Sequence, residues 1–375
     1  MKLCIVTPAI VKGDGQGRAN YEIVQEALRR GHQVTLVAHR VAEDLLTHPL
    51  IQWIQFPSLK LPTALLKEID FARRSARWLK QNAQQFDLVQ SYGSVTFWNS
   101  DVNTAQFVHT SWLRSPVHIS RQHRNLYGVY HWLHSILNSN WERKAFRKSR
   151  TVIAVSEGIS RELQQLGIPK ERIRVILNGV DTQEFIPGPS CREEVGLPLQ
   201  GTIALFAGDI KSNRKNLDTI LQSLVQVPNI NLVVVGRTEG SPYPALANEL
   251  GIADRVHFLG FRTDLPKIMR AVDLFVFPSR YEPFGMVVAE AMASGLPVIT
   301  SAITGAAEIV TPESGIVIQN PEDMTGLAKA LQRLASDREL RNRMGLVGRS
   351  IAQQHDWKSK AAEYLNIFES MEVTL

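Results

Sequence analysis

The sequence has little cysteine and no long hydrophobic run. Its 375 residues include two cysteines, Cys4 and Cys191, which give neither a disulfide framework nor the ligand spacing of a metal site. No run reaches the roughly 18 apolar residues that a membrane-spanning helix needs. No cluster of carboxylates suggests a bound Mg²⁺. These absences predict a metal-independent protein of the reducing cytoplasm.

The composition is that of a soluble globular protein with two domains. Hydrophobic residues make up 44% and charged residues 21% of the chain, and 375 residues suffice to bury two separate cores. The opening MKLCIVTPAIV is short and runs directly into a glycine-containing loop. We therefore interpret it as a first strand and not as a signal peptide.

The net charge of +6 is unevenly distributed along the chain. Between Lys60 and Arg150 there are 14 lysines and arginines against 5 acids, a net charge of +9, which leaves −3 for the remainder. This asymmetry predicts an anionic partner for the first half of the protein.

Two segments of this basic region combine charge with apolar side chains. Residues 65–80, LLKEIDFARRSARWLK, have an amphipathic helical pattern. They either cover a sheet or dock on an anionic membrane, with Trp53 and Phe56 before them. Residues 111–149 are rich in aromatic and basic residues and look helical from about Tyr127. We expect that helix near a binding cleft or a lipid surface and not at a nucleic acid, which needs a stacking platform.

The N-terminal pattern is strand, glycine-containing loop, helix and strand. The loop over residues 8–17 holds Gly13, Gly15 and Gly17, and the next strand, residues 32–37, is followed by a basic pair. The glycines are spaced G-x-G-x-G and not G-x-G-x-x-G, and an NAD site would want an acid after the second strand. The pattern therefore predicts a parallel α/β sheet but disfavours a dehydrogenase.

A histidine stands at the end of a later predicted strand. Residues 105–110 read AQFVHT, so His109 falls at the carboxyl end of this strand. In open α/β sheets ligands gather at the carboxyl ends of the strands. His109 is therefore a candidate site residue, and the alternative is a purely structural histidine.

The most informative stretch is residues 278–310. A buried strand, residues 274–277, precedes a loop with Pro278 and Pro283, then an alanine-rich helix, and a second strand. Glu282 stands just before the helix and Glu290 inside it. Helix N-termini bind anions, and eight helical residues rise about 12 Å, roughly the distance from a sugar to a ribose across a diphosphate. The alternative is a helix-start acid and a core carboxylate paired with a base.

This stretch resembles a known signature. Glu282 and Glu290 within E-P-F-G-x-x-x-x-E look like the signature of the retaining glycosyltransferases of family 4, and residues 293–299, ASGLPVI, are similar to the family's next block. The strand at 151–156 and the N-G-V-D turn at 178–181 are similar too. The resemblance implies the GT-B fold: α/β, with two Rossmann-like domains and an active site between them.

The resemblance also implies a division of the chain. Residues 1–190 would form the acceptor-side domain, residues 191–355 the nucleotide-sugar domain, and residues 356–375 a terminal helix that crosses back to the first domain. Glu282 would contact the donor sugar, Glu290 the ribose, and His109 the donor sugar from the other domain. Residues near the start of the helix, and glycines of the first loop, would also meet donor or acceptor: Phe284, Gly285, Met286, Val287, Gly15 and Gly17.

A basic loop in the second domain would serve the leaving group. Cations fixed near a departing diphosphate stabilise its developing charge. The family usually has G-R-L followed by a lysine, whereas this sequence has Gly208-Asp209-Ile210, so the usual arginine is missing. Lys215 matches the family lysine, and Arg214 or Lys211 would replace the arginine; the alternative is a solvated basic turn.

Two further segments resemble family loops. The turn at Gly260-Phe261 would lie against the nucleotide base. The segment Gly305-Ala306-Ala307-Glu308 would lie near the donor phosphates, although alanines stand where the family commonly has a second glycine and a proline.

The expected function follows from this resemblance. It is a retaining hexosyltransferase that moves a sugar from a UDP-, GDP- or ADP-sugar to a hydroxyl of a polysaccharide, glycolipid or small molecule, without cofactor or metal. Peripheral contact with an anionic membrane is a further hypothesis. The alternatives are a GT-B sugar-nucleotide epimerase or phosphorylase, or a non-catalytic subunit that binds a sugar nucleotide.

Overall fold

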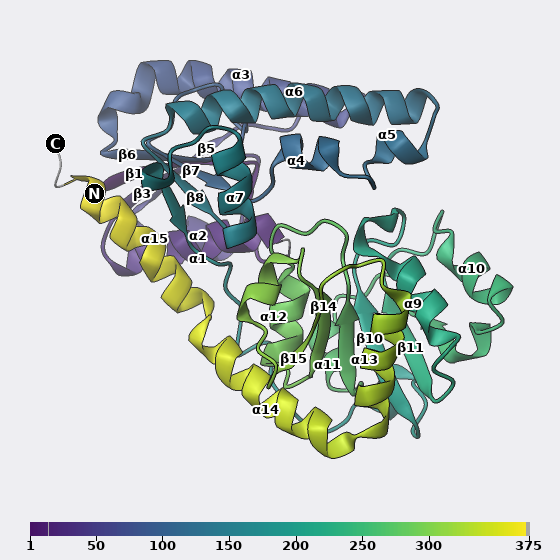
Figure 1. The fold of residues 1–375 in the computed structure, drawn as a ribbon. Helices are drawn as coiled ribbons and strands as arrows, with labels where there is room; N and C mark the ends of the chain where they lie inside the picture. The colour runs from purple at the N-terminus through teal and green to yellow at the C-terminus, as the bar shows by residue number, and fades with distance from the viewer. Residues whose placement is uncertain (14, 373–375) are drawn as a thin grey trace. The chain divides into compact units, whose positions relative to one another are not determined.

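The computed structural model describes residues 1–13 and 15–372, and the chain forms two compact units (Figure 1). The first unit contains residues 1–179 and the C-terminal helix from Trp357 onward, and the second contains Val180–Asp356. The division falls before the expected boundary at residue 190 because the intervening segment is bonded to the second unit. The Arg349 guanidinium donates to the carbonyls of Thr182 and Phe185, at 2.9 and 2.7 Å.

The first unit is built on a seven-stranded sheet in the order β5-β3-β1-β6-β7-β8-β9. Every recorded pairing in it is parallel. Most of its strands are short apolar runs, as expected where helices cover both faces of a parallel sheet. The strands are β1 (Lys2–Val6), β3 (Gln33–Ala38), β5 (Ile51–Gln55), β6 (Leu88–Tyr92), β7 (Val102–Ala105), β8 (Thr151–Ala154) and β9 (Ile173–Val175). Two short strands, β2 (Ala9–Ile10) and β4 (Arg40–Val41), pair separately.

Three of the longer helices of this unit start at a side-chain cap. The side chains of Thr63, Asn125 and Ser156 accept hydrogen bonds from the first turns of α3, α6 and α7. The helices are α1 (Gly15–Arg29), α2 (Glu43–Leu46), α3 (Ala64–Asn82), α4 (His109–Arg114), α5 (Ile119–Gln122), α6 (Leu126–Lys148), α7 (Glu157–Gln165) and α15 (Trp357–Glu372).

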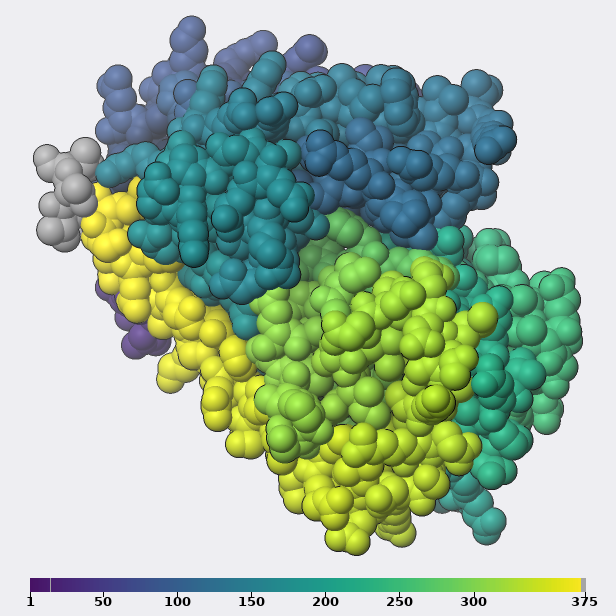
Figure 2. All heavy atoms as spheres, viewed as in Figure 1, coloured from purple at the N-terminus to yellow at the C-terminus, as the bar shows by residue number. Residues whose placement is uncertain are grey.

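The terminal helix α15 belongs to the core of the first unit. Tyr364, Leu365 and Phe368 are buried in one hydrophobic cluster with residues of β1, β3 and α1. Glu369 pairs with Arg30 at 2.7 Å and with His32 at 2.8 Å. In Figure 2 this helix, in yellow, lies along the side of the unit.

The second unit has a six-stranded parallel sheet in the order β12-β11-β10-β13-β14-β15. The strands are β10 (Thr202–Ala207), β11 (Ile230–Val235), β12 (Val256–Phe258), β13 (Leu274–Phe277), β14 (Val298–Ser301) and β15 (Gly315–Ile318). The helices are α8 (Arg192–Val195), α9 (Leu217–Leu224), α10 (Tyr243–Glu249), α11 (Leu265–Met269), α12 (Met286–Ala293), α13 (Met324–Ser336) and α14 (Arg338–Gln354). Two short 3₁₀ helices, η3 (Asn213–Lys215) and η5 (Gly305–Ile309), matter below.

Two local expectations were wrong. Strand β7 ends at Ala105, so His109 does not end a strand but opens helix α4. The backbone turns there because the His109 N–H donates to the Glu142 side chain and not to a neighbouring strand. Gly15 and Gly17 lie in the first turn of α1 and not in a loop.

Candidate active site

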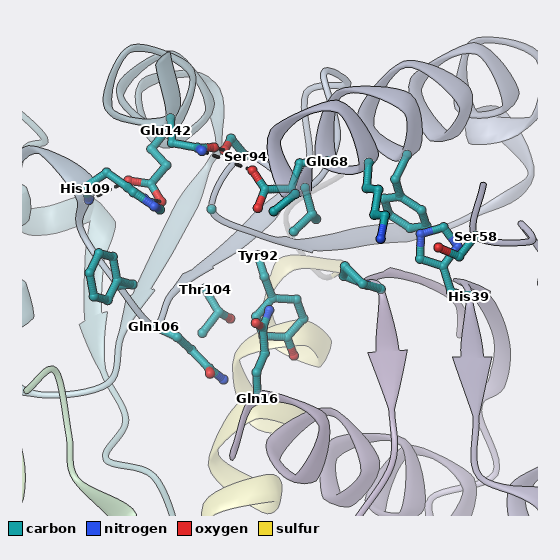
Figure 3. A pocket seen from close by; sticks show the side chains of 18 residues that line it. Gln16, His39, Ser58, Glu68, Tyr92, Ser94, Thr104, Gln106, His109 and Glu142 are labelled. Carbon is teal, nitrogen blue, oxygen red and sulfur yellow. Dashed lines mark hydrogen bonds and ion pairs between the residues drawn. The ribbon is translucent and has the colours of Figure 1, made fainter. Parts of the chain in front are cut away.

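The first unit contains a cavity of about 450 Å³ at the carboxyl ends of its central strands (Figure 3). Pro8, His39, Tyr92 and Gln106 follow or end β1, β3, β6 and β7, and all four line the cavity. Helices α3 and α6 supply further lining residues, among them Glu68 and Glu142. Since ligands of open α/β sheets bind at this edge, the cavity is a candidate substrate site.

His109 is held in this cavity by one carboxylate. Its imidazole Nδ1 donates to Glu142 Oε1 at 2.7 Å, and its backbone N–H donates to Glu142 Oε2 at 2.9 Å. Burial disfavours the charged imidazole, but the Glu142 carboxylate, helped by Glu68, outweighs it and raises the pKa of His109. With Nδ1 bound to Glu142, Nε2 is the ring nitrogen left to meet a ligand.

A second polar network lies beside it. Glu68 accepts from His134 Nε2 at 3.0 Å and from Asn138 Nδ2 at 3.1 Å. Ser94 Oγ in turn donates to Asn138 Oδ1 at 3.1 Å. Burial favours the neutral carboxyl of Glu68, but His134 and Asn138 prevail and lower its pKa. Figure 3 shows Glu68, Ser94 and Glu142 gathered at one side of the cavity.

Sequence reasoning missed Glu68, Asn138 and Glu142. The signal was present, because His134, Asn138 and Glu142 recur every four residues and so share one face of α6. The expected Gly15 and Gly17 flank Gln16, the residue of that turn that lines the cavity.

The second unit brings Lys215 and Glu282 together. Lys215 Nζ forms an ion pair with Glu282, and both side chains are 12% exposed. Arg214 Nη1 lies 3.8 Å from the same carboxylate. Burial, reinforced by the charge of Arg214, lowers the pKa of Lys215 well below its ordinary value, and burial also lowers the pKa of Arg214. Two half-buried cations therefore lie beside Glu282, and the charge of Asp209 acts on both of them.

The basic loop is fastened to the loop after β13. Asn216 has a left-handed backbone, φ 66°, and its amide donates to the carbonyls of Pro278 and Pro321 at 2.8 and 2.7 Å. The Arg214 carbonyl accepts from the Ser279 hydroxyl at 3.0 Å and from the Arg280 N–H at 2.9 Å. The Arg280 guanidinium pairs with Asp218 and Glu322. These residues, which sequence reasoning also missed, position Arg214 and Lys215 beside Glu282.

Helix α12 begins later than expected, at Met286. Gly285 before it has φ +89°, and a Cβ there would lie 2.8 Å from Thr304 Cγ2. The Glu282 carbonyl accepts from the Gly305 N–H at 3.0 Å, so this loop pairs with the start of η5. The assumption of eight helical residues was therefore wrong, because only the residues from Met286 to Glu290 are helical and they rise about 6 Å.

The remaining expected residues differ in their availability. Met286, Val287 and Glu290 are half-buried, whereas the Phe284 side chain is buried in the core and offers only its backbone. A Cβ on Gly208 would lie 3.6 Å from Lys215 Cγ, so this glycine adjoins the cation pair.

Two more expected residues are exposed. Phe261 is 64% exposed, with the Arg237 guanidinium 5.3 Å above its ring. Lys211 is exposed, so Arg214 and not Lys211 stands beside Glu282.

Two features, a metal-binding group and a membrane-spanning helix, are absent from the residues that the structure describes. No group of three or more His, Cys, Asp or Glu side chains among these residues is placed to hold a metal ion. No helix within them is long and apolar enough to cross a membrane.

Comparison with known proteins places both units. Residues 189–350 match the family model described as "Glycosyl transferases group 1", and residues 13–184 match the one described as "Glycosyltransferase Family 4". A D-inositol 3-phosphate glycosyltransferase from Xylanimonas cellulosilytica is 32% identical over 244 residues, 60% of this chain and 58% of that protein. The chain spans about three-fifths of the length of the first curated relatives that it matches.

Solved structures establish the fold. Sucrose-phosphate synthase from Thermosynechococcus elongatus superposes with a TM-score of 0.80 at 21% identity, over 100% of both chains. HepE from Anabaena, solved with UDP and glucose, has a TM-score of 0.71 at 22% identity and covers 99% of this chain and 100% of its own. The expected GT-B fold is confirmed, and with a family model matched over each unit, the chain belongs to glycosyltransferase family 4.

Proposed function

We propose that this protein transfers a sugar from a nucleoside-diphosphate donor to a hydroxyl acceptor, with retention of configuration and without a metal ion. The donor would bind to the second unit and the acceptor to the cavity of the first. The observation that carries this proposal is the pair of half-buried cations, Arg214 and Lys215, beside the carboxylate of Glu282.

The cation pair suits a diphosphate for an electrostatic reason. The cost of burying a charged lysine, increased by the nearby Arg214 and reduced by Asp209, lowers the pKa of Lys215. A diphosphate bound there would remove the cost, and its charge rises as the sugar leaves. The basic pair would do what a divalent cation does in other transferases, which supports a metal-free reaction.

The surrounding residues suggest how the rest of a donor is held. The N-terminus of α12 has no side-chain cap and carries the partial positive charge of a helix start. Glu282 would accept from hydroxyls of the donor sugar and Glu290, one turn into α12, from those of the ribose. Phe261 would lie against the base, and Gly208 and Gly285 would let the backbone approach the ligand.

The cavity of the first unit suits a hydroxyl-rich acceptor. Its polar groups include the carboxylates of Glu68 and Glu142, the amide of Asn138 and the hydroxyl of Ser94. Such groups accept from and donate to sugar hydroxyls, while the half-buried or buried rings of Phe71 and Phe107 offer apolar contact. His109, whose pKa Glu142 raises, would donate from Nε2 to the transferred sugar.

A transfer assay tests this proposal. UDP-glucose is the first donor to assay, because HepE was solved with UDP and glucose, and GDP- and ADP-sugars complete the panel. We expect metal-independent release of the nucleoside diphosphate, and retained anomeric configuration in the product. Epimerised donor or phosphate-dependent cleavage would indicate the epimerase or phosphorylase, and donor binding without turnover a non-catalytic subunit.

Membrane contact remains part of the proposal. The basic first half of the chain, with its net charge of +9 between Lys60 and Arg150, suits an anionic surface. A protein bound there would reach a lipid-borne acceptor.

Removal of the Lys215 charge should slow the reaction. We expect Lys215→Ala to raise the activation free energy by about 2–4 kcal/mol and so to lower kcat, because the lysine would stabilise the departing diphosphate. Arg214→Ala should show a smaller loss, since Arg214 lies farther from Glu282. Lys211→Ala is the matched control: steady-state kinetics in which Lys211→Ala is slow and Lys215→Ala is normal would show that the wrong cation was assigned.

Glu290→Ala should affect donor binding more than chemistry. Its position in the second turn of α12 is remote from the reacting carbon in our assignment, so the loss should appear mainly in the KM for the donor. Steady-state kinetics with varied donor measure this. A large drop in kcat at unchanged KM would contradict the ribose contact.

Glu142→Gln should reverse the pKa shift of His109. The carboxylate raises that pKa against the effect of burial, so its neutral isostere should leave burial dominant and bring the pKa below its ordinary value. His109 would then lose its proton at a lower pH, and activity that needs the imidazolium would decline as pH rises through that lower pKa. Titration of the His109 ring protons by NMR measures the shift, and an unchanged pKa would refute the role of Glu142.

A further inference from the structure

The first half of helix α6 is amphipathic in the reverse of the usual sense. Up to Glu142, the residues that α6 buries are small or polar, namely Gly128, Ser135, Asn138 and Glu142, and the buried Phe146 lies nearer the end of the helix. Gly128 and Ser135 face the segment of α5, where Ser135 bonds to His118, whereas Asn138 and Glu142 line the cavity and make the hydrogen bonds described above. A surface helix ordinarily turns its polar side to water. The exposed apolar side of α6 therefore indicates contact with an environment other than water.

The opposite side of this half-helix is apolar and exposed. The exposed fractions are Leu126 88%, Tyr127 53%, Val129 59%, Trp132 48% and Leu133 43%. Leu126, Val129 and Leu133 recur at the spacing of one helix face, with Trp132 and Tyr127 flanking it. We call these five residues the outer apolar face of α6; its segment, blue in Figure 2, lies at the surface of the unit.

The same stripe becomes basic in the second half of the helix. Arg143, Lys144, Arg147 and Lys148 are exposed there, and Lys144 and Arg147 continue the line of Leu126, Val129 and Leu133 around the helix axis. At the other end, Arg121 and Arg124 are exposed just before the helix. The one acid between residues 102 and 150 is Glu142, which is buried against His109. The exposed charge next to the outer apolar face is therefore positive throughout.

Helix α3, the first expectation for membrane contact, is less suited. Arg74 there is half-buried, bonded to Asp70 at 3.2 Å and to the Pro57 carbonyl at 3.0 Å. The expected anchors Trp53 and Phe56 are also half-buried: the Trp53 indole donates to the Ala38 carbonyl, and Phe56 packs on Phe71. These side chains are committed to the unit itself.

We propose that the outer apolar face of α6 inserts into the interface of an anionic lipid bilayer, with the neighbouring arginines and lysines on its headgroups. Tryptophan, tyrosine and basic residues around a lying helix are what this interface selects. The charge complementarity favours anionic lipid over a second copy of this chain, whose corresponding face is equally positive. The inner side of the same helix lines the cavity, so attachment would bring that cavity to the membrane. This proposal rests on the membrane contact of the proposed function and identifies the surface that makes that contact. It does not depend on the identity of the sugar donor.

Sedimentation with vesicles tests the proposal on the full chain without any substrate. We expect binding to vesicles of phosphatidylcholine with anionic phosphatidylglycerol, reduced by high salt, and little binding to phosphatidylcholine alone. The double variant Trp132→Ser/Leu133→Ser should lower the partition coefficient about 30-fold, since two half-exposed apolar side chains lose their burial in lipid. Arg121→Gln/Arg124→Gln should lower it by about fivefold for each charge.

The second unit offers matched controls. Leu346 and Val347 on α14 are 74% and 37% exposed, and Leu346→Ser/Val347→Ser should leave vesicle binding unchanged. Arg333→Gln/Arg338→Gln, two exposed arginines of α13 and α14, is the control for charge. Each variant should keep its circular dichroism and its thermal unfolding temperature.

Three results would overturn the proposal. The first is no binding to anionic vesicles at low salt, and the second is binding that Trp132→Ser/Leu133→Ser leaves intact. The third is a dimer in lipid-free sedimentation equilibrium that this variant dissociates, which would assign the face to a second copy. Transfer to a soluble acceptor is measured separately on the same variants. Absence of transfer refutes the proposed function alone, whereas transfer without vesicle binding refutes this surface alone.

Discussion

The placement of Arg214 and Lys215 beside Glu282 is the interaction around which the loops of the second unit are arranged. Arg214 and Lys215 repel each other in this half-buried site, so their backbone has to be held in place. Asn216 supplies that restraint with two hydrogen bonds from a left-handed backbone, and the Arg280 pairs with Asp218 and Glu322 hold the facing loop. A backbone so restrained keeps the two cations in place, which supports the leaving-group role proposed for them.

In the first unit, by contrast, the carboxylates of the cavity have histidine partners. Its carboxylates Glu68 and Glu142 are each matched by a histidine, at 3.0 and 2.7 Å, and hydrogen bonds from Asn138 and a backbone N–H complete the pairing. The cavity is therefore rich in polar groups that are hydrogen-bonded to one another. Carboxylates and amides suit a hydroxylated ligand, which supports the proposed binding of the acceptor to this unit.

Much of the fold was predictable because its signals are local. The apolar runs of β1, β8, β10 and β13 can each be read from a few residues, and the GT-B expectation drawn from E-P-F-G-x-x-x-x-E is confirmed by the solved structures. Lys215 and Glu282 could be proposed as site residues for the same reason, although their ion pair spans 67 positions of sequence. What failed depended on distant partners: His109 opens a helix and not a strand end because Glu142, 33 residues later, takes its N–H.

Helix α6 shows why polarity in sequence is an ambiguous guide to a surface. The usual inference places polar residues outside, and by that rule the basic helix α3 is the better membrane candidate. In α6 the buried polar residues bond to the α5 segment and to groups of the cavity, and the apolar residues of its first half lie outside. A helix that must line a polar cavity on one side can remain apolar on the other only if that side also escapes water. The position of α6 beside the cavity therefore determines both which of its residues line the cavity and which of its residues form the outer apolar face.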